Sequence, residues 1–307
     1  MKNFNGRVAV ITGAGSGFGR EFALYGASLG MKLVLADVLE APLNETVAIL
    51  KASGAEVVGK QCDVSNADDM DALAAFAMAS FGGVNLVFNN AGVGAGGLLW
   101  ENTVKDWQWV LGVNLWGVIH GVRVFTPLML EQAKNDTEYE GYIVNTSSMA
   151  GLLSPQLMGA YNVSKHAVVA LSETLFHDLH VAHAAQADQS SQQINCSVLC
   201  PAFVPTGISQ SHRARPETLK NSQAATASMK LAQSMTNKAV GSGKLSAADV
   251  ARLTFDAIVE NRFYIITHPK IMPTVQMRLD DIANQRNPRD PFAMKADVRP
   301  DLSNMPD

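Results

Sequence analysis

Short apolar runs alternate with longer helical stretches along most of the 307-residue chain. Several of these runs are apolar throughout, as expected for a parallel sheet with both faces covered by helices. Strand–helix alternation with right-handed crossovers builds a doubly wound sheet. The sequence therefore predicts an α/β fold with a doubly wound, mainly seven-stranded parallel sheet and helices on both faces. The predicted strands are 7–12, 32–37, 56–62, 84–89, 142–147, 194–200 and 263–267, and the predicted helices lie near 18–29, 42–53, 67–81, 103–131, 160–183 and 246–261.

The segments outside this alternation are polar. We expect one domain over 1–270, which contains most of these segments, followed by a C-terminal extension. Residues 132–141 and 184–193 are predicted surface loops. Residues 204–245 form a long connection, which in a compact fold is typical of a functional lid. Residues 271–307 are predicted to be a partly irregular C-terminal extension, whose last part, from about residue 288, lies outside the core.

The composition argues against several classes of function. Charged residues make up 17% and hydrophobic residues 47% of the chain, and the net charge is −4. Without a basic cluster, a nucleic-acid or anionic-membrane surface is not expected. No apolar run approaches the length of a membrane span. The first residues enter a strand without the apolar core of a signal peptide, so we expect a cytoplasmic protein that binds neither nucleic acid nor membrane.

The three cysteines are Cys62, Cys196 and Cys200. The last two lie four residues apart on one face of a predicted strand, roughly 13 Å at ~3.3 Å per residue, too far for a disulfide. They are not part of a His or Cys cluster with zinc-site spacing. We therefore expect reduced core cysteines and no metal site.

A glycine-rich loop follows the first predicted strand and opens a helix. It reads Thr12-Gly13-Ala14-Gly15-Ser16-Gly17-Phe18-Gly19. Glycines let a backbone turn sharply and approach a pyrophosphate, whose charge the helix N-terminus favours. A tight turn without a ligand is the alternative. In its strand–loop–helix context the loop predicts a Rossmann-type dinucleotide site that includes Gly13, Ser16, Gly17, Phe18 and Gly19.

Polar residues follow three further strands, where the carboxyl ends of a parallel sheet meet. Asp37 ends the second predicted strand, and a carboxylate there can accept both ribose hydroxyls of NAD and repel the 2′-phosphate of NADP. An ordinary loop aspartate is the alternative. No basic residue flanks Asp37, so the sequence favours NAD over NADP. The predicted crevice also includes Val38, Asp63, Val64, Asn90, Ala91 and Gly92.

Tyr161 and Lys165 lie four residues apart in a predicted helix, so their side chains share one face about one turn apart. A cation beside a phenol favours the phenolate, whose free pKa is about 10. Alone, this Y-x-x-x-K spacing is a weak signal, because amphipathic helices contain it by chance. Ser148 precedes Tyr161 by thirteen residues.

Together these motifs resemble the short-chain dehydrogenase/reductase family in its standard single-domain subtype. The T-G-x-x-x-G-x-G motif of that family matches residues 12–19, its N-N-A-G motif matches 89–92, and its Y-x-x-x-K motif matches 161–165. The match covers roughly residues 5 to 270. Several ordered motifs in one chain are far more specific than any one of them.

The resemblance implies roles for four residues. Tyr161 would exchange a proton with the alcohol or ketone oxygen, and Lys165 would lower the pKa of the tyrosine and hold the nicotinamide ribose. Ser148 would donate a hydrogen bond to the substrate oxygen, whereas the adjacent Ser147 lacks the thirteen-residue spacing. Asn114 would link the lysine to solvent through a water, although an asparagine inside a helix is more often an exposed polar residue.

The loop after the sixth predicted strand departs from the family pattern P-G-x-V-x-T. It reads Pro201-Ala202-Phe203-Val204-Pro205-Thr206, so alanine replaces glycine and requires a compatible backbone angle. Thr206 would contact the nicotinamide carboxamide. The resemblance also implies cofactor contacts at Pro201 and Val204, adenine contacts at Asp63 and Val64, and a contact of Asn90 near the adenine-side ribose.

Loops after the fourth, fifth and sixth strands are predicted to wall the substrate pocket. Their apolar side chains suit an apolar or aromatic secondary alcohol or ketone, although packing in the core or a subunit contact is the alternative for about half of them. His212, Arg213 and Arg215 open the 204–245 stretch and either hold a carboxylate or are solvated. The resemblance implies a homotetramer or homodimer formed through helices 103–131 and 160–183. The predicted pocket residues are Leu98, Leu99, Trp100, Met149, Leu152, Leu153, Met158 and Phe203.

These observations predict an NAD-dependent oxidoreductase that interconverts an apolar or aromatic secondary alcohol and its ketone by hydride transfer, with Tyr161 as acid and base. Two alternatives stay open: an NADP-preferring ketoreductase, and a catalytically idle dinucleotide-binding protein on the same fold. The combined presence of Asn114, Ser148, Tyr161 and Lys165 argues against the idle protein, because a pure binder needs no placed proton donor.

Overall fold

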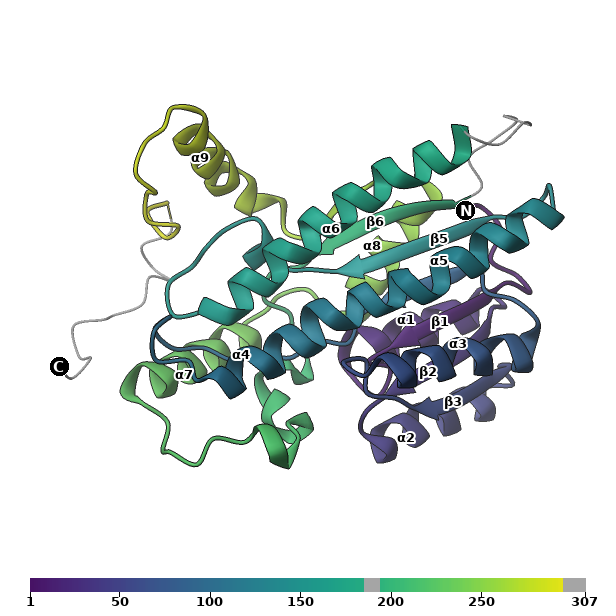
Figure 1. Cartoon of the computed structure of the whole chain (residues 1–307), viewed down its shortest axis with the longest axis horizontal. Coiled ribbons are helices and arrows are strands. Elements are labelled where there is room, and N and C mark those ends of the chain that lie inside the picture. The colour runs from purple at the N-terminus through teal and green to yellow at the C-terminus, as the bar shows by residue number, and fades with distance from the viewer. Residues whose placement is uncertain (185–193, 295–307) are drawn as a thin grey trace.

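One parallel sheet of seven strands organises the computed structural model, which describes residues 1–184 and 194–294 (Figure 1). The strand order is β3-β2-β1-β4-β5-β6-β7. The order reverses between β1 and β4, and a ligand crevice is expected at the carboxyl ends of these two strands. The predicted fold class is confirmed. The strands are β1 (Val8–Thr12), β2 (Lys32–Asp37), β3 (Val57–Gln61), β4 (Leu86–Asn89), β5 (Gly141–Thr146), β6 (Ile194–Cys200) and β7 (Tyr264–Ile266).

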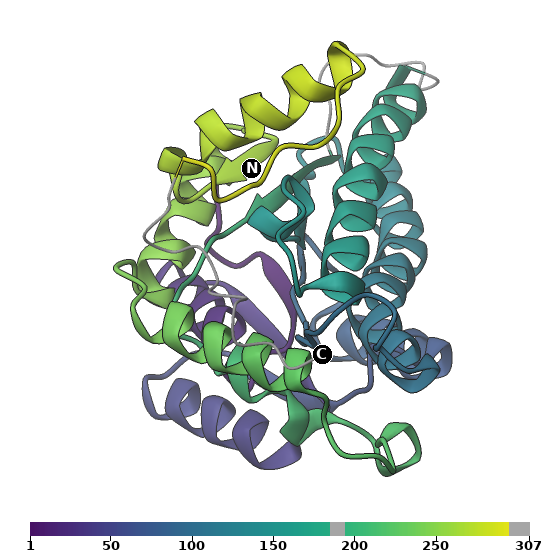
Figure 2. The same ribbon diagram turned by 90° about the vertical axis from the view of Figure 1, so that its left-hand side faces the viewer.

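Helices cover both faces of this sheet (Figure 2). Successive side chains of a strand point to opposite faces, so Ala9 and Ile11 pack in one apolar layer and Val8 and Val10 in the other. The first layer is closed by α1 (Gly17–Ser28), α2 (Glu40–Ala52) and α8 (Ala247–Val259), and the second by α3 (Ala67–Phe81), α5 (Gly117–Asn135) and α6 (Gly159–Ala184).

An aromatic cluster fixes α1 against the sheet. Phe22 of α1 stacks on Phe88 of β4 with 4.4 Å between ring centroids. Phe255 of α8 lies 5.6 Å from Phe88, and all three rings are buried. Burying a side chain of this size contributes roughly 1.5–3 kcal/mol. Because α1 begins at the glycine-rich loop, the cluster also holds that loop in place.

The predicted helix over 103–131 consists of three segments. The first is α4 (Val104–Leu111), whose N-cap Thr103 and third residue Asp106 form a capping box. A π-helical turn, η1 (Gly112–Trp116), leads into α5. The loop predicted over 132–141 is wrong at its start, because α5 continues to Asn135 with Ala133 still buried.

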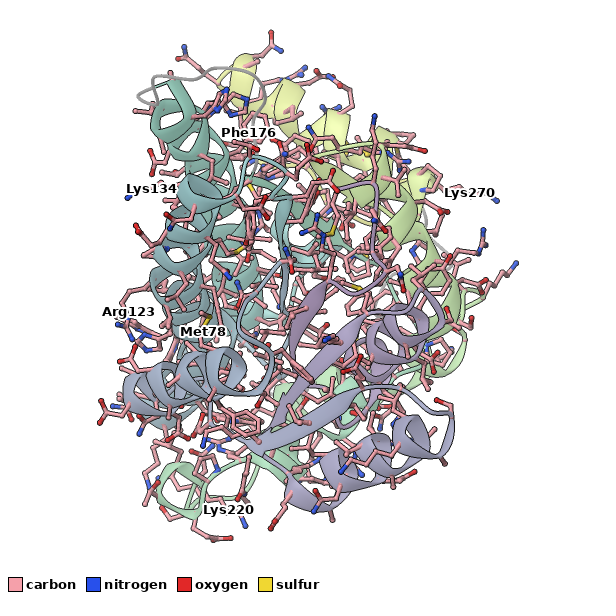
Figure 3. The ribbon with its side chains drawn as sticks, turned by 90° about the vertical axis from the view of Figure 1, so that its right-hand side faces the viewer. Met78, Arg123, Lys134, Phe176, Lys220 and Lys270 are labelled. Carbon is pink, nitrogen blue, oxygen red and sulfur yellow. The ribbon has the colours of Figure 1, made fainter. Side chains whose placement is uncertain are left out.

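Within the described part of the chain, the helical stretch Val104–Asn135 is the one whose length and mean hydropathy of 1.2 would allow a membrane span. Core helices of globular folds share these properties. Phe125 and Met129 of this stretch are buried against the sheet, and Arg123 and Lys134 project from its outer face (Figure 3).

The 204–245 connection is more regular than predicted. It contains the 3-10 segments η3 (Gly207–Ala214) and η4 (Glu217–Leu219) and the helix α7 (Ala227–Gly241). Few residues of α7 are buried, so its sequence lacks a strong apolar stripe. Sequence periodicity alone therefore missed this helix.

The C-terminal extension also contains regular structure. The segment η5 (Pro269–Ile271) leads into α9 (Met272–Ala283), which projects beyond the sheet in Figure 1. The prediction of partial irregularity omitted this helix. The predicted loop 184–193 beyond Ala184, and residues 295–307, lie outside the described residues.

Candidate active site

A cavity of about 1120 Å³ opens at the carboxyl ends of the central strands. It begins at the glycine-rich loop, passes the ends of β4 and β5, and extends to α7 and the C-terminal extension. Every predicted catalytic and cofactor-binding residue lines this cavity except Gly19 and Asn114. The structure therefore brings the separate sequence motifs to one place.

The glycines of the loop permit close backbone packing. A Cβ atom on Gly19 would lie 2.1 Å from the Gly13 carbonyl oxygen, and one on Gly13 would lie 2.9 Å from Cα of Ala91. Gly13 and Gly17 also have φ values of +67° and +52°, which glycine adopts without strain. The side chain of Ser16, the N-cap of α1, makes no capping hydrogen bond. The first turn of α1 thus fits an anionic group such as a pyrophosphate.

Asp37 lies at the end of β2 beside this loop. Its Oδ2 accepts a hydrogen bond from the Gly15 amide and its Oδ1 one from the Leu39 amide, both at 2.9 Å. Burial raises the pKa of Asp37, and these backbone hydrogen bonds oppose that rise. The nearby Arg20 donates to the Gly15 carbonyl at 2.8 Å and pairs with Glu45 at 3.0 Å. Its charge is therefore engaged elsewhere, and the carboxylate edge fits ribose hydroxyls rather than a phosphate.

Asn90 connects the strand ends beneath the cofactor crevice through hydrogen bonds. Its amide nitrogen Nδ2 donates to the Thr12 carbonyl at 3.0 Å, and its backbone amide donates to the Thr12 hydroxyl at 2.9 Å. Thr146 Oγ1 donates to Asn90 Oδ1 at 3.3 Å. These bonds tie the ends of β1, β4 and β5 together.

The predicted proton-transfer residues Ser148 and Tyr161 meet at the centre of the cavity. Burial raises the pKa of Tyr161, and a hydrogen bond with Ser148 partly opposes this. Ser148 Oγ accepts from the Ala150 amide at 3.1 Å and lies 3.4 Å from the Pro201 carbonyl. Ser147 instead donates to the Lys165 carbonyl at 2.8 Å, so it positions α6 and does not line up with the phenol.

Lys165 lies one helical turn beyond the tyrosine, as predicted. Its Nζ donates to the Thr146 carbonyl at 2.9 Å and lies 5.7 Å from the centre of the Tyr161 ring. Burial lowers the pKa of Lys165 to about 8. Without the cofactor, burial has the largest effect on the pKa of Tyr161 and raises it. The lowering of this pKa by Lys165, which the family resemblance implies, therefore stays a prediction for the cofactor-bound protein.

Asn114 lies in the π-helical turn η1 and is fully buried, so the alternative of an exposed polar residue is wrong. Its side chain pairs with both backbone groups of Val93, at 2.8 and 2.9 Å, and donates to Ser164 Oγ at 3.1 Å. Ser164 in turn donates to the Tyr161 carbonyl at 2.8 Å. Asn114 therefore connects the loop after β4 to α6, and π-turns often occur at functional sites. Sequence spacing gave no indication of Ser164.

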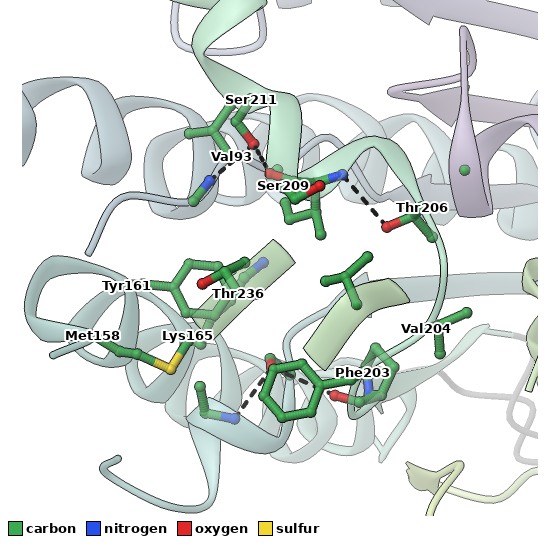
Figure 4. A pocket seen from close by; sticks show the side chains of 18 of the residues that line it. Val93, Met158, Tyr161, Lys165, Phe203, Val204, Thr206, Ser209, Ser211 and Thr236 are labelled. Atoms are coloured by element: carbon green, nitrogen blue, oxygen red, sulfur yellow. Dashed lines mark hydrogen bonds between the residues drawn. The ribbon is translucent and has the colours of Figure 1, made fainter. Parts of the chain in front are cut away.

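The substrate side of the cavity is apolar, but its walls differ from the prediction. Met149, Leu153, Met158 and Phe203 line it, and Met158 lies beside Tyr161 in Figure 4. The other predicted wall residues, Leu98, Leu99, Trp100 and Leu152, do not line it. Trp100 is 79% exposed. Residues of α7, such as Thr236, take this side of the cavity instead.

The loop after β6 accepts its alanine without strain, because Ala202 is not among the non-glycine residues with positive φ. Thr206 lies over the glycine-rich loop, where a Cβ on Gly17 would approach the Thr206 Cβ to 3.2 Å. Arg215 is neither solvated nor free for a carboxylate ligand, because it pairs with Asp106 at 2.7 Å. Arg213 lines the cavity, whereas His212 is exposed and does not.

The three cysteines are free and buried, as predicted. Within the described residues, no group of three or more His, Cys, Asp or Glu side chains is arranged to hold a metal ion.

A glycine-rich dinucleotide crevice joined to a Ser–Tyr–Lys centre defines a nucleotide-dependent oxidoreductase. The short chain dehydrogenase family model matches residues 7–217, and the chain belongs to the short-chain dehydrogenase/reductase family. A CLA biosynthesis dehydrogenase/reductase of Lactiplantibacillus plantarum is 32% identical over 94% of this chain and 97% of its own length. A 1-deoxy-11-beta-hydroxypentalenate dehydrogenase of Streptomyces exfoliatus is 30% identical over 90% and 88%, respectively.

The solved structures give the same family. A short chain dehydrogenase/reductase from Burkholderia phymatum, crystallised in complex with NAD, is 59% identical and superposes with a TM-score of 0.90. The superposition covers 95% of this chain and 100% of that protein.

The buried Lys165 should give folding a distinct pH dependence in the cofactor-free protein. Its folded pKa of about 8 lies below its unfolded value of about 10.4, so the unfolded chain binds more protons between these values. The free energy of unfolding should therefore rise from about pH 8 to about pH 10.4, and Lys165→Met should lack a rise on the order of 1–3 kcal/mol. Urea unfolding across this range measures the difference.

Lys134→Met is the matched control, because Lys134 is exposed on α5 and should leave the pH profile unchanged. Parallel profiles for wild type and Lys165→Met would contradict the lowered lysine pKa.

Proposed function

We propose that the chain is an NAD-dependent dehydrogenase that interconverts an apolar or aromatic secondary alcohol and its ketone. The observation that carries the proposal is a single cavity that joins the glycine-rich loop to an apolar chamber with Tyr161 between them. Met149, Leu153, Met158 and Phe203 give this chamber an apolar wall that suits an apolar or aromatic substrate. Residues 1–270 form the proposed catalytic domain, and a cytoplasmic location is proposed with it.

The choice of NAD over NADP rests on Asp37. Its carboxylate faces the crevice, Arg20 is paired with Glu45, and a 2′-phosphate beside Asp37 would meet like charge. The Burkholderia phymatum relative was crystallised with NAD, which supports the same choice. Gly13, Gly17 and Thr206 would hold the pyrophosphate and nicotinamide parts of the dinucleotide.

The proposed chemistry needs one proton and one hydride to leave the alcohol. NAD, when bound, supplies the hydride acceptor. Tyr161 takes the hydroxyl proton as base and returns it in the reverse reaction, and Ser148 donates a hydrogen bond to the same substrate oxygen as charge develops on it. The ammonium group of Lys165 lies near the Tyr161 ring, and Asn114 positions α6 through its hydrogen bond to Ser164.

A screen for NADH formation tests the proposal. The protein is incubated with NAD and a panel of apolar, aromatic and charged secondary alcohols, and absorbance of NADH is followed. Turnover of the apolar or aromatic members is the expected result. Tight NAD binding without turnover of any member would favour the idle dinucleotide-binding alternative.

Asp37→Ser should narrow the preference for NAD. Loss of the carboxylate removes both the ribose hydrogen-bond acceptor and the repulsion of a 2′-phosphate, so the ratio of the Kd values for NADP and NAD should fall by about 10-fold or more. Calorimetric titration of both nucleotides measures the ratio. Asp71→Ser on the outer surface is the control, and an equal ratio in all three proteins would contradict the assignment.

The proposed assembly is a dimer or tetramer through the outer faces of α4, α5 and α6. Trp116, at the end of the η1 turn between α4 and α5, and Val163 of α6 are 51% and 48% exposed, respectively. Apolar side chains at this exposure are suited to a contact between subunits.

A further inference from the structure

The C-terminal arm, residues 286–294, folds back along α9. The Arg289 guanidinium donates through Nε to both carboxylate oxygens of Asp281, at 2.8 and 3.1 Å, and through Nη2 to the Met277 carbonyl at 3.0 Å. Asp281 is buried at 4% exposure, and Arg286 also pairs with it at 3.4 Å. Because the buried Asp281 carboxylate binds two guanidinium groups of the arm, the start of the arm is fixed against α9.

The other end of the arm contacts the loop that runs from Ser148 to Met158, just before Tyr161, which we name the catalytic loop. Gln156 Nε2 donates to Asp290 Oδ1 at 3.1 Å, and the Phe292 backbone amide donates to the same oxygen at 2.9 Å. Gln156 lies between Ser148 and Tyr161 in the sequence. The arm and the catalytic loop, far apart in the chain, are therefore joined directly.

The catalytic loop is also held by a contact with the loop after β4. Leu157, directly after Gln156, has a φ of +63° although it is not glycine, and it is buried. Its carbonyl accepts a hydrogen bond from the Gly97 amide at 2.8 Å. A residue in this conformation persists where surrounding contacts fix it, so the arm packs against a well-positioned loop.

The arm itself lines the cavity. Pro291 and Phe292 belong to its wall, as do Ile271 of η5 and Thr274 of α9. Ile271 also packs with Leu153 of the catalytic loop in a small apolar cluster. The chamber is thus enclosed between α7 on one side and the arm on another, and Phe292 supplies the arm's aromatic surface.

We propose that the C-terminal arm is the outer wall of the substrate chamber, and that Phe292 determines the largest group the chamber accepts on the carbinol carbon. This inference rests on the proposed function and deepens it. We expect compact aryl ketones to be accepted beside Phe292, and ketones with two bulky apolar groups to be disfavoured by it. A pocket contact of this kind discriminates by about 10-fold or more between substrates that differ in apolar bulk.

The affinity of ketones for the NAD-bound protein measures the effect of this wall without turnover. Acetophenone and benzophenone are titrated calorimetrically into the full-length protein saturated with NAD, a pair that cannot react because both partners are oxidised. Wild type should bind acetophenone more tightly, and Phe292→Ala should reduce this discrimination by about 10-fold. Met294→Ala, an exposed arm residue outside the cavity wall, should change nothing, and the Kd for NAD should be equal in all three proteins.

A pair of shortened chains tests the arm as a whole. A chain ending at Met294 should retain the wild-type discrimination, whereas a chain ending at Asn287 should lose it. The point variants keep the test decisive if the shorter chain fails to fold.

Each outcome decides between the two proposals. Equal discrimination in wild type and Phe292→Ala, with alcohol oxidation intact, overturns the wall but not the proposed function. Discrimination that depends on Phe292 without oxidation of any alcohol supports the wall and overturns the proposed function. Absence of binding of either ketone overturns the wall, because the chamber is then not a ketone site.

Discussion

Replacing Tyr161 with phenylalanine should lower kcat for alcohol oxidation by two to four orders of magnitude, about the contribution of a placed general base. The substitution removes one oxygen and leaves the ring, so packing in the buried site is kept. Ser148 cannot take over, because its hydroxyl is already held by the Ala150 amide and lacks a base beside it. Initial rates of NADH formation at saturating alcohol measure the loss.

Two controls separate chemistry from structure in this experiment. Tyr264→Phe removes a phenol that donates to Glu173 at 2.6 Å outside the cavity, and it should leave kcat unchanged. The Kd for NAD should stay equal in Tyr161→Phe and wild type. Full turnover by Tyr161→Phe would contradict the assignment of Tyr161 as the general acid and base.

The pH dependence of the reaction has a definite sign. Burial raises the pKa of Tyr161 in the chain alone, so the phenol is protonated at neutral pH and the base form gains population as pH rises. The rate of alcohol oxidation should therefore increase with pH, and this increase should be absent from the residual activity of Tyr161→Phe. A pH profile of kcat from neutral to alkaline pH measures it.

The strands were predicted to within two residues, and the signature is simplest where a strand is buried on both faces. β5 and β6 are buried at every position, and their sequences are largely apolar. Glycine spacing likewise identified the cofactor loop, since a Cβ on Gly19 would meet a backbone oxygen. These features depend on local chemistry that a sequence displays directly.

The missed features depend on contacts between distant segments. Polar helix α7 and helix α9 bury few residues, so their periodicity is weak, and only tertiary contacts show that they close the cavity. Trp100 follows the end of β4, as the cavity-lining Val93 does, yet it is 79% exposed. The contact of Gln156 with Asp290 spans 134 residues and has no local signature.

The start of the 204–245 connection is anchored by a buried carboxylate. Asp106 accepts from Arg215 at 2.7 Å, from Asn221 at 3.0 Å and from the Thr103 amide at 2.8 Å. The Arg215 guanidinium also lies 4.9 Å above the Trp109 ring. The side chains of Asp106 and Arg215 are 5% and 13% exposed, so neither charge is well hydrated. The network joins the N-terminus of α4 to the segment that leads into α7.

Asp106→Ala should destabilise the fold by about 3 kcal/mol, because removal of one partner leaves the Arg215 charge poorly solvated and unpaired. Burial opposes ionisation of Asp106, but hydrogen bonds from Thr103, Arg215 and Asn221 hold its pKa below the ordinary value. Since the folded pKa is depressed, the stabilisation is complete above the unfolded pKa of about 3.9 and is lost as pH falls through the folded value. Urea unfolding of wild type and variant, at neutral pH and below about pH 4, measures both effects.

The surface pair between Arg123 and Asp71, at 2.9 Å but with both side chains about half exposed, is the matched control. Asp71→Ala should cost at most about 1 kcal/mol, because water already solvates both charges. The double variant Asp106→Ala/Arg215→Met should recover part of the loss, since an apolar chain replaces the stranded guanidinium. Equal destabilisation by Asp106→Ala and Asp71→Ala would show that the Asp106 network does not anchor the 204–245 connection, and the connection would then owe its position to α7 alone.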